Sequence, residues 1–256
     1  MSQPTIELHT LSTSDGSATY TSPTRSHTIL SGISYPLEVQ YRSHELPEDT
    51  YIEVNIIPHN AVSQVKERHV EEIVRRVLKS VVRSQETPRC LLAVTLQVVD
   101  AEVDEEVPGG VKGGGQGEGY LEVLAGAINA SVAGCLDGGV QMWGIAGAVV
   151  VGVDGEGEVV VWPGSRAQKA ARSLHVFGFG RGGECLVVES EGAFEVEDWE
   201  RAAGMARKVV LGRNKGDGDG DGDEDEDVDM DDDSGRQSLF GVMRQAVEMR
   251  VAKDGR

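Results

Sequence analysis

Histidine, cysteine and serine side chains are the residues of this chain best suited to metal binding or nucleophilic chemistry, so their spacing is the first test of function. Cys90, Cys135 and Cys185 are far apart and form no Cys-x-x-Cys pair, which argues against a zinc site or a disulfide framework and fits a reducing compartment. No serine has a histidine and an acid that the sequence can assign to it. The histidines show no ligand spacing and are expected in ordinary surface or core roles; they are His9, His27, His44, His59, His69 and His175. We predict no metal site and no cofactor, and we assign no nucleophile.

Two low-complexity segments resemble ligand-binding loops without meeting their requirements. Residues 108–119 read PGGVKGGGQGEG, and Lys112 is followed by glycine, whereas a phosphate-cradling loop needs Gly-Lys-Ser/Thr at the start of a helix. Residues 213–235 alternate Asp and Gly, but a calcium loop also needs a bidentate Glu at its twelfth position and flanking helices of matched spacing. We interpret the first segment as a surface loop and the second as a disordered acidic insert that binds cations only weakly.

The acidic charge of the chain is concentrated in that insert. Lys and Arg number 24 against 43 Asp and Glu, a net charge of −19; residues 213–235 hold 12 acidic and 2 basic side chains, so the rest of the chain carries −9. Phosphate contacts need clustered cations, so a net charge of −19 argues against a nucleic-acid partner. The argument is weaker for the folded part, which is only moderately acidic. No apolar stretch approaches the roughly 20 residues that span a bilayer, and residues 1–13 lack a secretory leader pattern. We predict no membrane association.

The N-terminal half alternates between strand and helix patterns. Residues 6–58 contain short apolar runs separated by turn residues, which predict three or four antiparallel strands. Apolar residues from Val70 to Val81 recur at three- and four-residue spacing and predict an amphipathic helix that ends before Pro88. Residues 91–100 alternate strictly and predict a strand with one buried face.

The C-terminal half begins with residues 120–136, which are rich in Ala and Leu with almost no charge and predict a buried helix. Residues 140–153 with 158–162, and 173–178 with 185–189, predict two hairpin-like strand pairs, and residues 195–211 predict a helix. We predict one α+β domain over residues 1–212 with the glycine-rich loop 108–119, then the acidic insert 213–235, then a C-terminal helix within 236–256 that docks on the domain.

The order of these motifs resembles the RNase PH family. A strand ending in VDAE precedes a glycine-rich gap, and LAGAINASVAGCLDGGVQMWGIAGAVVVGV then resembles the family's buried helix, turn and strand of small residues. SDGSATY at residues 14–20 and the helix at residues 66–82 occur in the matching order. The resemblance covers residues 5–212 and the terminal helix, while the acidic insert has no counterpart. It implies the RNase PH-like (ribosomal protein S5 domain 2-like) fold, with mixed β-sheets packed with helices.

The resemblance also implies that the catalytic groups of the family are absent. Active members carry a Gly-Thr-Arg phosphate site before the buried helix, whereas here Gly119 is followed by Tyr120 and Leu121. Glu72 stands where an arginine would face RNA, and a carboxylate there would repel phosphate. The stretch matching the catalytic aspartates, residues 161–174, contains no Asp or Glu. We therefore predict a degenerate phosphate site and no catalytic residue.

Within the family, the resemblance is to the catalytically silent ring subunits of the eukaryotic RNA exosome. It implies a six-membered ring of three RNase PH-like heterodimers, RNA-binding cap subunits, a separate hydrolytic exoribonuclease, single-stranded RNA as ligand, and a location in nucleus, nucleolus and cytoplasm. His59, Lys66 and Arg68 are the candidate RNA contacts, with plain solvent-exposed charge as the alternative. The alternative function is an active phosphorolytic exoribonuclease of the RNase PH type or a homodimeric nuclease.

Overall fold

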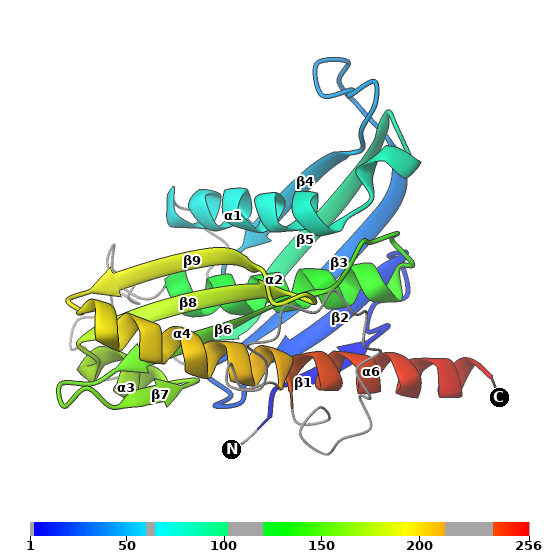
Figure 1. The fold of residues 1–256 in the computed structure, drawn as a ribbon. Helices are drawn as coiled ribbons and strands as arrows, with labels where there is room; N and C mark the ends of the chain where they lie inside the picture. The colour runs from blue at the N-terminus through cyan, green and yellow to red at the C-terminus, as the bar shows by residue number, and fades with distance from the viewer. Residues whose placement is uncertain (1–2, 60–64, 102–119, 213–237, 256) are drawn as a thin grey trace, which may run out of the picture.

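The computed structural model describes residues 3–59, 65–101, 120–212 and 238–255, which form two sheets with helices between and around them (Figure 1). The first sheet has the strand order β1-β2-β3-β5-β4 and the second the order β7-β6-β8-β9. The strands of the first sheet are β1 (Thr5–Leu8), β2 (Gly16–Thr21), β3 (His27–Glu38), β4 (Tyr51–Ile57) and β5 (Cys90–Ala101). Those of the second are β6 (Ala146–Val153), β7 (Val159–Val161), β8 (Ser173–Gly180) and β9 (Cys185–Gly192).

The first sheet is mixed, which corrects one prediction. β1, β2 and β3 pair antiparallel as expected, but β4 pairs parallel with β5, with Ile52 opposite Leu92. The reason is the crossover helix α1 (Val65–Val81), which carries the chain back along the sheet so that β5 runs in the same direction as β4. The expectation that all strands before residue 58 are antiparallel was therefore wrong for the last of them.

The helix and strand patterns of residues 70–100 are confirmed. α1 buries an apolar stripe that includes Val70, Val74 and Leu78, and it begins five residues before the apolar repeat does. A short 3₁₀ helix, η1 (Ser84–Glu86), follows it. In β5, Leu92 and Leu96 are fully buried on the predicted face. α1 packs against β4 and α2, and burial of its apolar stripe contributes to the core of this half of the molecule.

The predicted buried helix, α2 (Tyr120–Asp137), lies between the two sheets and is bonded to both. Ser31 on β3 donates its hydroxyl to the Ala130 carbonyl at 2.8 Å. On the other side, the Asn129 amide donates to the Ala148 carbonyl of β6 and accepts from its N–H, both at 2.8 Å. Both polar side chains are thus fully satisfied inside the core, as buried polar groups must be to avoid a desolvation cost.

The second sheet and the outer helices follow the predicted order with local differences. The two strand pairs are present, but β6 begins at Ala146 rather than near residue 140, and the six-residue helix α3 (Ser165–Ala170) was not predicted. α4 (Val196–Leu211) covers the second sheet, and α6 (Leu239–Asp254) lies beside α4 and β1. α6 buries apolar side chains in its first half, from Leu239 to Ala246, whereas Val251 near its end is 65% exposed. The loop 108–119 and the insert 213–235 lie outside the described residues.

Candidate functional site

The predicted phosphate site lies where the N-terminal ends of α1 and α2 meet the C-terminal end of β9, at the left of Figure 1. Tyr120, the first residue of α2, packs edge-on against His69 of α1, with 5.5 Å between the ring centroids. Its hydroxyl donates a hydrogen bond of 3.4 Å to the Glu189 carboxylate on β9. The side chains that surround this helix start are therefore an aromatic ring, an imidazole and a carboxylate.

The electrostatics of this helix start oppose an anion. Burial raises the pKa of the Tyr120 phenol above its usual range, and the charge of Glu189, the hydrogen bond to Glu189 and the charge of Glu191 raise it further. A group whose ionisation is opposed by two carboxylates lies in a negative potential. That potential would repel phosphate by the same mechanism, whereas an enzyme that uses phosphate places cationic donors where the anion binds.

This arrangement predicts the titration of Tyr120. Glu189→Gln should lower the pKa of Tyr120 part of the way to its ordinary value, because the charge and the ionic hydrogen bond are removed while the burial remains. Since the folded pKa is raised, the stability linked to Tyr120 is full below its ordinary pKa of about 10 and decreases as pH rises through the folded value. Ultraviolet difference titration against Tyr120→Phe measures the shift. Glu156 is an exposed turn residue, so Glu156→Gln is the control and should leave the pKa of Tyr120 unchanged. If Tyr120 titrated at the same pH in Glu189→Gln as in Glu156→Gln, the contact between Tyr120 and Glu189 would be contradicted.

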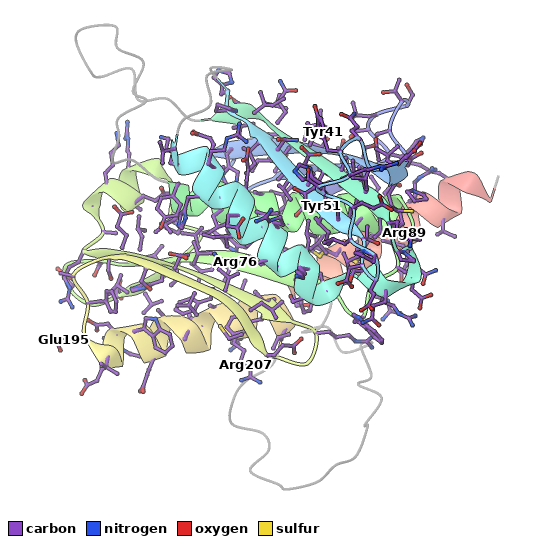
Figure 2. All side chains as sticks on the ribbon, turned by 90° about the horizontal axis from the view of Figure 1, so that it is seen from above. Tyr41, Tyr51, Arg76, Arg89, Glu195 and Arg207 are labelled. Atoms are coloured by element: carbon purple, nitrogen blue, oxygen red, sulfur yellow. The ribbon has the colours of Figure 1, made fainter. Side chains whose placement is uncertain are left out.

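The other two residues of the predicted phosphate site are Leu121 and Glu72, and both side chains are engaged in other contacts. Leu121 is 1% exposed and belongs to the core. Glu72 forms ion pairs with Arg75 and with Arg76, the latter at 3.2 Å, and Arg76 lies on the outward side of α1 (Figure 2). Two guanidinium groups therefore compensate the charge of Glu72, and its place in a degenerate phosphate site stays a prediction. The contact between α1 and Tyr120 is made by His69, one turn earlier.

The candidate RNA contacts are held on two adjoining elements. His59, directly after β4, is exposed and its Nδ1 donates to the Val99 carbonyl of β5 at 3.0 Å. Arg68 is exposed and pairs with Glu71 at 2.9 Å, and Lys66 is half-buried. The residues that connect His59 to α1 lie outside the described part of the chain. The role of His59, Lys66 and Arg68 in RNA binding stays a prediction.

The stretch that matches the family's catalytic aspartates is basic. It contains α3 and ends at Arg172, which pairs with Asp198 of α4 at 2.6 Å; Arg201 binds the same carboxylate. Burial alone would raise the pKa of Asp198, but the hydrogen bonds from Arg201 and from the Glu195 backbone and the charges of both arginines outweigh it and hold the pKa below its usual range. Sequence reasoning missed Asp198, whose signal was an acid three residues into a helix. The lowered pKa favours the ionised carboxylate, which links α4 to Arg172.

A histidine between two serines lies nearby but has no access to a substrate. His175 on β8 is fully buried, its Nε2 is 3.0 Å from the Ser173 hydroxyl, and its Nδ1 is 2.8 Å from that of Ser190. Burial lowers the pKa of His175, opposed in part by the charge of Asp198. Because Ser173 is also buried, the trio is a core hydrogen-bond network, in keeping with the ordinary role expected for this histidine.

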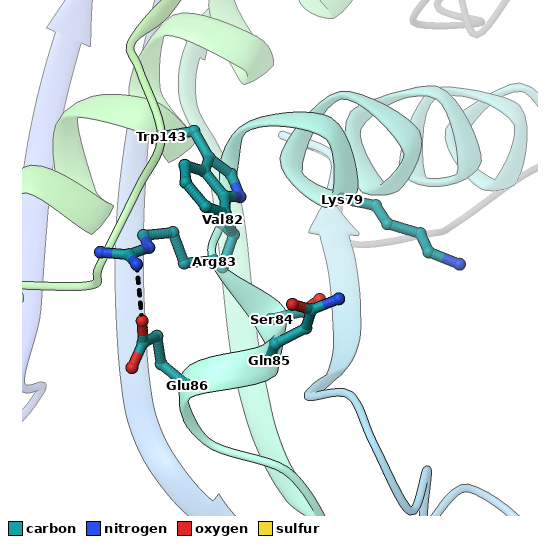
Figure 3. Close-up of a pocket in the computed structure, with 7 residues that line it drawn as sticks. All are labelled: Lys79, Val82, Arg83, Ser84, Gln85, Glu86 and Trp143. Atoms are coloured by element: carbon teal, nitrogen blue, oxygen red, sulfur yellow. Dashed lines mark ion pairs between the residues drawn. The ribbon is translucent and has the colours of Figure 1, made fainter.

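A shallow depression of about 260 Å³ lies at the opposite end of α1 (Figure 3). Most of its lining is polar or charged, and the exposed indole of Trp143 and the side chain of Val82 are apolar. The lining consists of Lys79, Val82, Arg83, Ser84, Gln85, Glu86 and Trp143. This depression could not be predicted from the sequence, because it joins the end of α1 to a segment some sixty residues further along the chain.

Among the residues that the structure describes, no group of three or more His, Cys, Asp or Glu side chains is placed to hold a metal ion. No helix in the same described ranges is long and apolar enough to cross a bilayer.

No family model matches the sequence. The exosome complex component RRP46 of Saccharomyces cerevisiae is 24% identical over 195 residues, which is 73% of this chain and 81% of that protein. The crystal structure of rice (Oryza sativa) Rrp46 matches with a TM-score of 0.66 at 22% identity, covering 80% of this chain and 88% of that one. An archaeal exosome core matches with a TM-score of 0.59 at 12% identity, covering 80% and 82%. The Archaeoglobus fulgidus exosome with RNA bound to its active site matches with 0.60 at 10% identity, covering 80% and 84%.

The chain thus has the RNase PH-like fold of exosome core subunits, and the predicted α+β, RNase PH-like fold class is confirmed. Within that class it is similar to Rrp46 in both sequence and structure. The likeness that the motifs predicted, to the exosome ring subunit called ribosomal RNA-processing protein 46, is confirmed with it.

Proposed function

We propose that the chain is a non-catalytic ring subunit of the eukaryotic RNA exosome that supports 3′-to-5′ RNA processing and degradation. The observation that carries the proposal is the start of α2, where Tyr120 is surrounded by His69, Glu189 and Glu191 in place of cationic donors. The acid-free stretch 161–174 supports it, because phosphorolysis requires a group that moves a proton or polarises the phosphodiester.

The partners in this proposal are other RNase PH-like exosome subunits, with which the chain forms a heterodimer in a six-membered ring, together with RNA-binding cap subunits and a hydrolytic exoribonuclease. The open edges of both sheets support assembly. The edge strands β4 and β9 expose Ile57 and Val188, which are 40% and 42% accessible, and exposed edge strands of this kind are normally covered. In this proposal the chain works in the nucleus, nucleolus and cytoplasm, and single-stranded RNA passes through the ring.

A phosphate-dependent RNA degradation assay tests the loss of catalysis. The chain, alone and co-purified with its ring partners, should release no more nucleoside diphosphate from a short single-stranded RNA with inorganic phosphate than without it. The reason is that the contacts of Tyr120 among the described residues, with His69 and Glu189, offer no cationic donor to the attacking anion. An active RNase PH enzyme serves as the positive control. Clear diphosphate release that Tyr120→Ala or Glu189→Ala abolishes would overturn the proposal and favour the phosphorolytic alternative.

A further inference from the structure

Trp143 is exposed, and its backbone is rigidly held. It lies between α2 and β6 and is 71% exposed. The backbone N–H of Trp143 donates to the Val81 carbonyl at 2.7 Å, and the backbone N–H of Arg83 donates to the Gln141 carbonyl at 2.9 Å. These two bonds fix the segment to the end of α1, so the indole is presented from a fixed backbone. A rigid aromatic side chain loses little conformational entropy when it binds a partner.

The Arg83 guanidinium covers one face of this indole. Its Cζ lies 4.5 Å from the ring centroid, a cation–π arrangement, and its Nη2 pairs with Glu86 at 2.7 Å. The Nε of Arg83 is buried and finds no hydrogen-bond acceptor among the described residues. With one face of the ring occupied and most of the residue accessible, the other face is open to solvent beside the depression (Figure 3).

Two further cationic residues lie on elements that adjoin Trp143. Lys79 extends from the last turn of α1 and lines the depression. On the other side, the Arg181 side chain lies beside Gly144, where an added Cβ would be 3.8 Å from Arg181 Cβ. These side chains come from α1 and from the β8–β9 turn, two elements far apart in the sequence.

The arrangement continues to α4, where the Arg207 guanidinium lies against the same β8–β9 turn at Gly183; Figure 2 labels Arg207 at this end of α4. Two carboxylates, Glu86 and Glu184, are interspersed. The four cations Lys79, Arg83, Arg181 and Arg207 outnumber them, in a chain whose net charge is −19.

We propose that Trp143 and these cations form a binding surface for single-stranded RNA, on which a base stacks on the open indole face and the adjoining phosphates contact Lys79 and Arg181. Proteins that bind single strands without sequence preference stack bases on aromatic side chains and contact the phosphate backbone with cations. An acidic peptide would match the charge but offers no planar group for the indole. The surface is distinct from the predicted contacts at Lys66 and Arg68, because about 16–20 Å of α1 separates these two residues from Lys79.

Fluorescence anisotropy of a labelled oligouridylate with the full-length chain tests the surface. Trp143→Ala should weaken binding about 10-fold or more, since removing one stacked base costs this much, whereas Trp143→Phe should retain most of the affinity. Tyr41→Ala, which removes an aromatic residue of similar exposure (65%) on the β3–β4 connection, is the matched control and should bind as the unaltered chain does. Because Trp162 is buried and Trp199 is half-buried, RNA should also quench tryptophan fluorescence chiefly through Trp143.

The salt dependence separates stacking from charge. Lys79→Ala should weaken binding to all single-stranded sequences equally and should reduce the slope of log affinity against log salt by about 1, as expected for one lost phosphate contact. Unaltered affinity in Trp143→Ala would overturn the proposal, as would binding that depends instead on His59, Lys66 and Arg68. Loss of ring-partner co-purification in Trp143→Ala with RNA affinity unchanged would also overturn it, since the surface would then be a protein interface. Each of these outcomes leaves the scaffold role intact, because phosphate-dependent release tests that role separately.

Discussion

Replacing Gly16 by alanine is expected to lower the free energy of unfolding by about 3 kcal/mol, the upper part of the range for overpacked core sites. Gly16 begins β2, and a Cβ at this position would lie 2.5 Å from the Gly134 carbonyl oxygen and from the Gly138 Cα. Both obstacles are backbone atoms at the end of α2, so no side-chain rotation can relieve the clash. Urea denaturation followed by circular dichroism measures the loss.

The matched control is the same chemical change where there is space. Gly204 lies on the exposed side of α4, and an added Cβ meets nothing within 4 Å. Gly204→Ala should raise the free energy of unfolding by about 0.5–1 kcal/mol, because alanine restricts the unfolded chain and favours helix. If Gly16→Ala were as stable as the unaltered chain, β2 could not lie against the end of α2 as the structure has it.

The same contact explains why the fold could be predicted from motifs that carry no chemistry. SDGSATY contains Gly16 and Ser17, and LDGG contains Asp137 and Gly138; in the structure these two motifs touch, because the Ser17 N–H donates to the Asp137 carboxylate at 2.9 Å. A glycine and a carboxylate are needed at this joint between β2 and α2 for steric and hydrogen-bonding reasons. Their presence therefore indicates the fold and says nothing about catalysis, whose loss we infer from Tyr120 and from residues 161–174.

Periodicity predicted the elements whose burial is decided by one face. The stripe from Val70 to Val81 and the alternation of β5 both became buried faces, and the uncharged stretch after Tyr120 became the helix between the sheets. Strand direction could not be obtained this way, because the alternation of β4 is the same whether its neighbour is parallel or antiparallel. α3 was missed because six residues without an apolar repeat carry no helical signal.

The functional surfaces were less predictable, because their groups meet only after folding. The distances that matter join Tyr120 to Glu189 and Arg83 to Trp143, residues about sixty or more positions apart. Comparison with the family pattern showed that Tyr120 stands at a position of the family's phosphate site. It could not show that the Glu189 carboxylate contacts Tyr120. It also gave no signal for Trp143, since a tryptophan in a connecting segment is as compatible with a core role as with an exposed one.

The second large effect is expected at Asp137, where one buried carboxylate holds three parts of the chain together. Its side chain is 2% exposed; it accepts the Ser17 N–H at 2.9 Å and pairs with Arg250 of α6 at 3.3 Å and with His9 at 3.7 Å. Asp137→Ala should lower the free energy of unfolding by about 2–4 kcal/mol, because a partly buried donor loses its acceptor and an arginine loses one of its partners. Thermal and urea unfolding of the full-length chain measure this loss.

Asp137→Asn separates shape from charge, because the amide oxygen can still accept the Ser17 N–H while the attraction to Arg250 is lost. It should cost about half as much as the alanine variant. Asp154→Ala is the control: this carboxylate also accepts two backbone N–H groups, both at 2.9 Å, but in an exposed turn, where water replaces it and the loss should stay within about 1 kcal/mol. Equal effects at Asp137 and Asp154 would show that α6 and β2 are not coupled through this carboxylate, and the LDGG motif would then need another physical explanation.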